Sequence, residues 1–265
     1  MGQGKGKYTA HIAVVASAVG LSLAVWGAAA LMDNEAVARM GDTATSQPEG
    51  KPKGPEQVRP QKVPESIAHA AEAGGSAVNI TIDDGPDPRW TPQMLDILKQ
   101  NGVKAVFCMV GPMAKQNPDI VKRVVAEGHR LCDHTVSHDT TMDKKPFAYQ
   151  KQEILDAKKM IEDAAGGARI DYYRAPGGAF TPDSRRLAAG LGMRPLGWNV
   201  DTKDFEQPGT ASIVNTVKNE LSNGPTILFH DGGGDRSQTV AALRQVLPWL
   251  KENGHSFSFP VRTTP

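Results

Sequence analysis

The sequence predicts an α/β fold built on a parallel sheet. Between residues 77 and 259, short runs rich in β-branched and aromatic residues alternate with helical patterns. Aspartate, histidine and arginine residues recur at the C-terminal ends of those runs, where proteins with parallel sheets place their active sites. About seven strands alternating with helices fit either a barrel or a doubly wound sheet.

The strands are expected at 78–82, 103–110, 129–132, 172–174, 196–200, 226–230 and 255–259. Three of the helices between them begin at a capping residue followed by proline, because the cap oxygen accepts a hydrogen bond from a free amide. These pairs are Thr91-Pro92, Asn117-Pro118 and Thr181-Pro182. Gly102, Gly128 and Gly190 are expected at the helix C-termini. Apolar stripes over 213–221 and 240–250 predict two further helices.

The N-terminal part is expected to lie outside this domain. Lys5 and Lys7 precede an uncharged run over 12–32, and acidic residues follow it, so the rest of the chain is expected outside the cytoplasm. Two interpretations stay open: an uncleaved signal anchor, or a signal peptide with a cleavage site at 36–38. The chain therefore divides into a signal peptide or anchor (1–32), a flexible Pro-rich linker (33–76) and a catalytic domain (77–265).

Composition excludes several classes of protein. The 265 residues include 30 basic and 29 acidic side chains, so no positive field is available for nucleic acid. Two cysteines are too few for a disulfide scaffold or an all-cysteine metal site. Cys108 and Cys132 lie near the ends of two strands expected to be neighbours; a disulfide and two small buried thiols are both open interpretations.

His134 and His138 lie four residues apart after the third predicted strand, and imidazoles at this spacing can converge on one ion. A carboxylate from another strand end would complete a three-ligand site of the kind that suits a hydrolytic zinc. Asp83 and Asp84 end the first strand and point in different directions, so one can bind the metal and the other accept a proton. Two unrelated loop histidines and a simple Asp-Gly turn are the alternatives.

Three further strand ends supply polar candidates. Arg174 could orient a carboxylate and keep it ionised, or could form an ordinary surface ion pair. His230 could protonate a leaving group, with Asp201 or Asp204 raising its pKa. Trp198 and Phe205 follow as aromatic side chains that either stack on a sugar or pack in the core.

Five segments, in order, resemble the motifs of the polysaccharide deacetylases, also called the NodB-homology or carbohydrate esterase family 4 domain. They are 81–86 (TIDDGP), 134–138 (HTVSH), 174–178 (RAPGG), 201–205 (DTKDF) and 228–230 (LFH). The sequence departs from the family pattern twice. Gly177 stands where an aromatic residue is usual, and Phe205 stands where tryptophan is usual.

The resemblance implies a distorted (β/α) barrel that removes acetyl groups from carbohydrate with a divalent metal, Zn²⁺ or Co²⁺. By family analogy the metal ligands are Asp84, His134 and His138. The other implied roles are a base (Asp83) oriented by Arg174, an acid (His230) supported by Asp201 or Asp204, an oxyanion-binding amide near Gly177, and an acetyl-pocket wall (Leu228).

We expect the substrate to be N-acetylglucosamine residues of peptidoglycan or chitin-type oligomers. An acetylxylan esterase acting on O-acetyl groups and a non-catalytic glycan-binding wall protein are the alternatives. The expected partner is an acetylated polysaccharide, with membrane contact only through an uncleaved N-terminal helix. We expect a monomer, either secreted or anchored to the outer face of the plasma membrane.

Overall fold

The structure is a computed structural model that describes residues 62–264. The predicted signal or anchor helix (1–32) and residues 33–61 of the predicted linker lie outside this range. Within the described residues, no helix is both long and apolar enough to span a bilayer.

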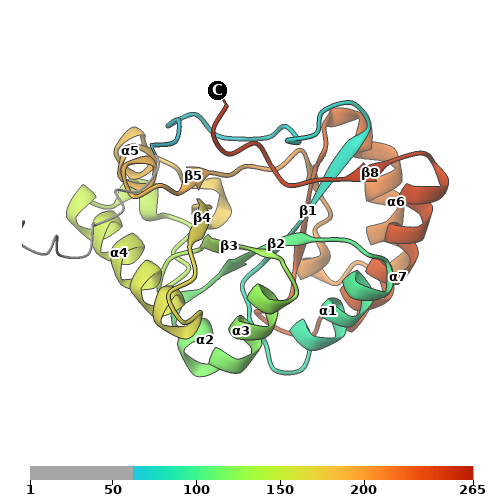
Figure 1. Cartoon of the computed structure of the whole chain (residues 1–265), viewed down its shortest axis with the longest axis horizontal. Helices are drawn as coiled ribbons and strands as arrows, with labels where there is room; N and C mark the ends of the chain where they lie inside the picture. The colour runs from blue at the N-terminus through green and yellow to red at the C-terminus, as the bar shows by residue number, and fades with distance from the viewer. Residues whose placement is uncertain (1–61, 265) are drawn as a thin grey trace, which may run out of the picture. The chain divides into compact units, whose positions relative to one another are not determined.

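A curled sheet of parallel strands forms the centre of the domain (Figure 1). Its order is β5-β4-β3-β2-β1-β7-β6, and β8 pairs with the beginning of β1. The strands are β1 (Ala77–Asp83), β2 (Ala105–Met109), β3 (Arg130–Asp133), β4 (Ile170–Tyr173), β5 (Arg194–Pro195), β6 (Val200–Asp201), β7 (Thr226–His230) and β8 (Ser256–Phe257). The expectation of a distorted (β/α) barrel is confirmed.

Helices cover the outside of the sheet. They are α1 (Thr91–Gln100), α2 (Gly111–Gln116), α3 (Pro118–Ala126), α4 (Phe147–Ala164), α5 (Pro182–Gly190), α6 (Thr210–Glu220) and α7 (Ser237–Glu252). In Figure 1 they form an arc from α5 at the left, along the lower edge, to α6 at the right. Val78, Ile80 and Ile82 of β1 belong to the large apolar core that includes helix residues, whereas Thr81 and Asp83 bond to Arg174 on the other face of the strand.

The upper side in Figure 1 has no helix between α5 and α6, and the two ends of the described chain cross it. Ala68 bridges to Leu196, and Ala71 bridges to Pro260. Val63, Ala68 and Ala71 are buried. The predicted linker boundary is therefore corrected: residues 62–76 belong to the folded domain, because they bond to the segment that joins β5 to β6.

The predicted helix caps are confirmed at one N-terminus and wrong at other positions. Thr181 forms the predicted capping box, with its hydroxyl accepting from Ser184 N. Thr91 and Asn117 make no side-chain cap bond. The expected C-terminal glycine of α5 is wrong by two positions, because Gly190 lies inside the helix and Gly192 takes the positive φ of 82°.

The strand predicted at 196–200 is interrupted in the structure. Only Arg194–Pro195 and Val200–Asp201 pair as strands, and the intervening segment leaves the ladder. Its carbonyl oxygens at Leu196 and Gly197 accept from Arg174 instead.

Candidate active site

The predicted site residues meet in one pocket of about 280 Å³ at the C-terminal ends of the strands. All of them line it except Asp204, which is fully buried and bonded to His230. Thr140 and Ala175 complete the lining. Polar groups from β1, β3, β4, β6 and β7 thus converge, as expected for parallel strands that end at one rim.

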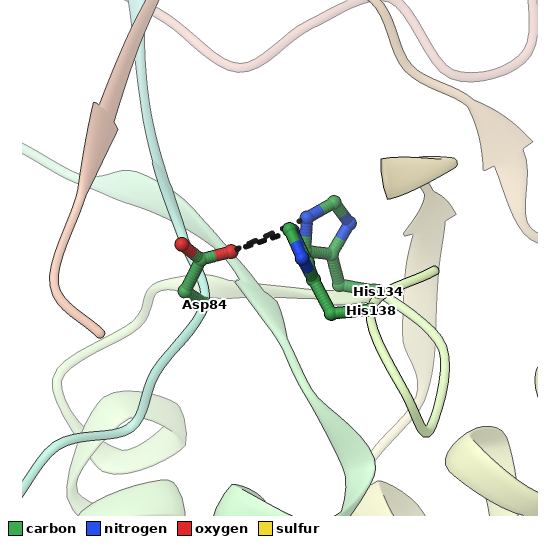
Figure 2. Close-up of side chains that lie close together, drawn as sticks. All are labelled: Asp84, His134 and His138. Atoms are coloured by element: carbon green, nitrogen blue, oxygen red, sulfur yellow. Dashed lines mark ion pairs between the residues drawn. The ribbon is translucent and has the colours of Figure 1, made fainter. Parts of the chain in front are cut away.

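Asp84, His134 and His138 bring three potential ligand atoms together (Figure 2). Asp84 Oδ1 lies 3.1 Å from His138 Nε2 and 3.5 Å from His134 Nε2. Candidate ligand atoms of all three residues lie within 4.8 Å of one another. Asp84 directly follows β1, and both histidines lie on the loop after β3, so the sheet itself sets their spacing.

The hydrogen bonding of His134 shows which atom faces the carboxylate. His134 Nδ1 lies 2.7 Å from the Arg174 carbonyl oxygen, which can only accept, so Nδ1 carries a proton. The Nε2 atom of the neutral ring then presents a lone pair toward Asp84. Asp84 Oδ1 is buried, and no residue in the described part of the chain donates a hydrogen bond to it. Lone pairs that converge in this way suit a divalent cation between them.

The negative charges in the pocket favour a cation there, either a proton or a metal ion. Burial lowers the pKa of His134, but the negative charges of Asp83 and Asp84 outweigh it and raise that pKa overall. Burial likewise opposes ionisation of Asp84, yet the facing imidazoles of His134 and His138 hold the pKa of its carboxyl well below the usual range. Asp84 is therefore an anion at any ordinary pH, as a metal ligand must be.

Asp231 fixes the turn that carries Asp84. Asp84 has a φ of 80°, and the next amide, Gly85 N, donates to Asp231 Oδ1 at 2.9 Å. A Cβ at residue 85 would overlap the Asp231 carboxylate, so only glycine fits there. Thr91 Oγ1 donates to the second oxygen of Asp231 at 2.5 Å. Burial raises the pKa of Asp231 to about 7.

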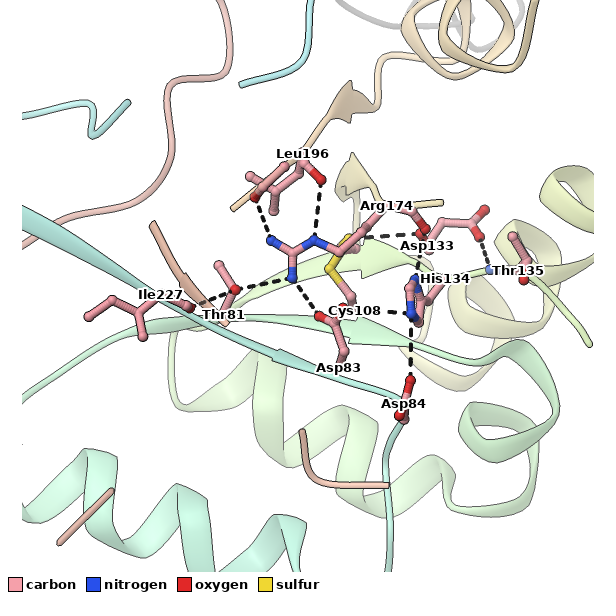
Figure 3. Close-up of a disulfide and its surroundings, with 12 residues drawn as sticks. Thr81, Asp83, Asp84, Cys108, Asp133, His134, Thr135, Arg174, Leu196 and Ile227 are labelled. Carbon is pink, nitrogen blue, oxygen red and sulfur yellow. Dashed lines mark hydrogen bonds and ion pairs between the residues drawn. A yellow bond between two sulfur atoms is a disulfide. The ribbon is translucent and has the colours of Figure 1, made fainter. Parts of the chain in front are cut away.

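Asp83 faces the other way, toward Arg174 (Figure 3). Arg174 Nη1 donates to Asp83 Oδ1 at 2.6 Å and to Thr81 Oγ1 at 3.0 Å. The remaining guanidinium donors reach Leu196 O and Gly197 O, and the side chain is fully buried. Asp83 Oδ2 lies 3.6 Å from His134 Nε2, so this oxygen borders the ligand cluster.

His230 pairs with Asp204 and not with Asp201. His230 Nδ1 lies 2.7 Å from Asp204 Oδ1, and His230 N donates to Asp204 Oδ2 at 2.9 Å. Asp201 Oδ1 instead accepts from Lys203 N at 3.0 Å. Burial lowers the pKa of His230, but the Asp204 hydrogen bond and charge outweigh it and raise the pKa to about 9. His230 thus carries a proton at neutral pH.

Comparisons with known proteins agree with this geometry. The model of the polysaccharide deacetylase family matches residues 70–196. A peptidoglycan-N-acetylglucosamine deacetylase of Bacillus cereus is 40% identical over 185 residues, covering 68% of this chain and 84% of that protein. The chain belongs to the polysaccharide deacetylase family. It is accordingly a hydrolase of the deacetylase type.

Two further relatives extend the likeness of this deacetylase over the domain. A chitooligosaccharide deacetylase of Sinorhizobium fredii is 34% identical over 202 residues, covering 72% of this chain and 92% of that protein. A solved peptidoglycan N-acetylglucosamine deacetylase is 31% identical, with a TM-score of 0.68 over 75% of this chain and 95% of that one.

The deacetylase departs from the family pattern at the rim of its pocket. Gly177 has a φ of 59°, and a Cβ there would lie 3.1 Å from Thr140 Cβ, so Thr140 borders the position where the family usually has an aromatic. Phe205 is 44% exposed and packs edge-on against the His230 ring at 5.1 Å. Trp198 is half-buried, and Leu228 is buried in the pocket wall.

The deacetylase has a disulfide close to its site. Cys108 and Cys132 are register partners on β2 and β3 and are bonded to each other, which decides between the two sequence interpretations. Both are fully buried and belong to a small cluster with Tyr172 and Leu196. Figure 3 shows the disulfide beside Asp83 and Arg174.

Several residues in or beside the deacetylase site were not predicted from the sequence. Thr81 could have been found, because strand alternation places it on the same face as Asp83. Asp231 directly follows His230 and so shares the strand-end signal. Thr140 and Glu153 carried no local signal, since their neighbours are brought to them only by tertiary structure.

Proposed function

We propose that this deacetylase removes N-acetyl groups from N-acetylglucosamine residues of peptidoglycan or chitin-type oligomers. The names of the relatives support this substrate class. The observation that carries the proposal is the pocket itself. It joins a three-ligand group to a carboxylate held by arginine and to a protonated histidine.

Asp84, His134 and His138 would hold the metal, and Zn²⁺ suits two imidazoles and one carboxylate, with Co²⁺ as an alternative. When bound, such an ion polarises the acetyl carbonyl and lowers the pKa of a coordinated water. Asp83 would accept the proton of the attacking water at Oδ2, the oxygen that borders the ligand cluster. Arg174 holds the other oxygen and keeps the carboxylate ionised and oriented.

His230 would protonate the departing amine, because it carries a proton and lines the same pocket. Asp204 orients the ring through Nδ1 and leaves Nε2 free to face the substrate. The backbone amide near Gly177 would stabilise the developing oxyanion. Leu228 would contact the acetyl methyl, while Phe205 and Trp198 offer rings for stacking on sugar.

We further propose that the protein is exported, either secreted or held at the outer face of the plasma membrane. The charge pattern around residues 12–32 supports export. A buried disulfide supports it as well, because such bonds persist mainly in oxidising compartments.

The test uses the full chain in detergent, stripped with a chelator and resupplied with Zn²⁺ or Co²⁺. Acetate release is measured on N-acetylglucosamine oligomers and on acetylated xylan. Asp83→Asn should lower kcat by roughly 10²–10⁴-fold, the usual scale of proton-transfer catalysis. Asp119→Asn, on the exposed face of α3, is the matched control. Metal-independent release, or full activity of Asp83→Asn, would contradict the proposal.

A further inference from the structure

The loop that carries both histidines has an unusual backbone. Thr135 has a φ of 69° and His138 a φ of 53°, and neither is glycine. Left-handed conformations of ordinary residues cost about 1 kcal/mol or more each and persist only where the surroundings enforce them. Contacts that hold this loop therefore also determine where its two imidazoles lie.

Glu153 makes three of those contacts from outside the pocket. Its Oε2 atom accepts from Val136 N at 3.1 Å, from Ser137 N at 2.8 Å and from Ser137 Oγ at 3.0 Å. Tyr149, one turn earlier on the helix, brings its hydroxyl to 3.1 Å from Ser137 Oγ. Both side chains project from α4, whose Ile154 and Ile161 are fully buried, so the loop is tied to a firmly packed element.

The two imidazoles depend on this loop to different degrees. His134 has its own anchor, because its Nδ1 atom donates to Arg174 O at 2.7 Å. The His138 side chain is 38% exposed, and among residues 62–264 no hydrogen bond reaches its Nδ1 atom. Apart from its contact with Asp84 and the His134 ring, the position of His138 follows from the loop backbone.

We propose that Glu153 is a positioning residue that sets the metal affinity of the site by fixing the loop that presents His138. The proposal rests on the metal site of the proposed function. The Glu153 carboxylate does not line the pocket. It acts on the site through the amides of Val136 and Ser137. Outer-shell partners of this kind typically change metal affinity about 10–100-fold when they are removed.

The experiment measures Co²⁺ and Zn²⁺ dissociation constants of the full chain by competition with a chelator, together with the visible spectrum of the Co²⁺ form. Glu153→Ala should weaken binding about 10–100-fold. Glu153→Gln should lie between it and wild type, because a neutral oxygen accepts about half as strongly as a carboxylate. At saturating metal, kcat should stay near wild type, since the catalytic groups are unchanged.

Glu162→Gln is the matched control, because it lies on the same helix and its carboxylate pairs, among the described residues, only with Lys158 in a half-buried ion pair. It should leave both dissociation constants unchanged. Unaltered metal affinity in both Glu153 variants would overturn the inference, and so would an equal loss in Glu162→Gln. Failure of wild type to bind either metal would instead overturn the proposed function. Glu153→Gln preserves side-chain size and helix propensity, so its result stands if Glu153→Ala fails to fold.

Discussion

The motif at residues 201–205 contains two carboxylates, Asp201 and Asp204, whose surroundings differ in the structure. Asp204 is fully buried and accepts from His230, Thr202 and Thr239, so both of its oxygens are occupied. Asp201 lines the pocket, and within residues 62–264 only the amide of Lys203 donates to its carboxylate. The sequence left both as candidates, because both follow the same strand at nearly the same distance from it.

This difference predicts a shift in the pH profile. On the proposed mechanism His230 is the acid, so turnover should be lost as pH rises through its pKa of about 9. Asp204→Asn removes the charge that raises this pKa, and the alkaline limb of kcat/KM should move about 1–2 units toward lower pH. Rates between pH 5 and pH 10 provide the measurement. Asp201→Asn is the control and should leave that limb in place; the opposite pattern would reassign the supporting carboxylate.

At the scale of elements, residues 62–76 close the barrel. Arg194, which is almost fully buried, donates from Nε to Ser66 O at 2.8 Å, and Ala68 exchanges backbone hydrogen bonds with the segment at 195–197. Removing this segment would expose apolar surface and leave buried donors without acceptors. A chain beginning at residue 77 should therefore lose at least about 3 kcal/mol of stability relative to one beginning at residue 62. Equal urea midpoints for the two chains would contradict the closing role.

The disulfide between β2 and β3 is a second stabilising element. It closes a loop with a sequence separation of 24, for which chain-entropy arguments give about 3 kcal/mol. The double variant Cys108→Ala/Cys132→Ala should unfold in urea with a free energy lower by about that amount. Reducing the wild-type protein with dithiothreitol in denaturant should reproduce the loss. A change below about 1 kcal/mol would show that packing, and not the cross-link, holds these strands together.

The elements also show what the sequence could and could not predict. The strand at Thr226–His230 was found to the residue, because a continuous buried run bounded by proline and glycine is a local signal. The strand predicted at 196–200 is interrupted because its carbonyl oxygens accept hydrogen bonds from Arg174, more than 20 residues earlier in the chain. Thr91 lost its capping role because Asp231, 140 residues away, recruits its hydroxyl. Site residues were predictable where a motif ended a strand, and partners across the fold were not.

Over the barrel as a whole, the candidate active site and the buried histidine His129 lie at opposite ends of the strands. The C-terminal rim holds the ligand cluster, Asp83 and His230 in one pocket. At the opposite end, His129 lies just before β3, and its Nδ1 atom accepts from Ala105 N at the beginning of β2 at 3.0 Å. This histidine is buried beside Phe107 at the end of the strands opposite the rim. We therefore expect it to contribute to stability and not to catalysis.

His129 should make the whole fold sensitive to acid. Burial, with a contribution from the charge of Lys104, lowers its pKa from 6.5 to about 4. The unfolded chain therefore binds one more proton than the folded chain between these values, and stability falls as pH drops from about 6.5 to about 4. At pH 5 the loss from this group should be about 2 kcal/mol relative to pH 7.

Urea unfolding of wild type and His129→Asn at pH 7 and pH 5 measures this contribution as a double difference. Both proteins are kept in chelator, so that protonation of the metal ligands affects them equally and cancels. Asparagine Oδ1 takes the place of Nδ1 and can accept from Ala105 N but does not titrate, so the variant should lose about 2 kcal/mol less than wild type over this pH range. Equal losses in the two proteins would mean that His129 is protonated without unfolding, and that water reaches its ring in the native barrel.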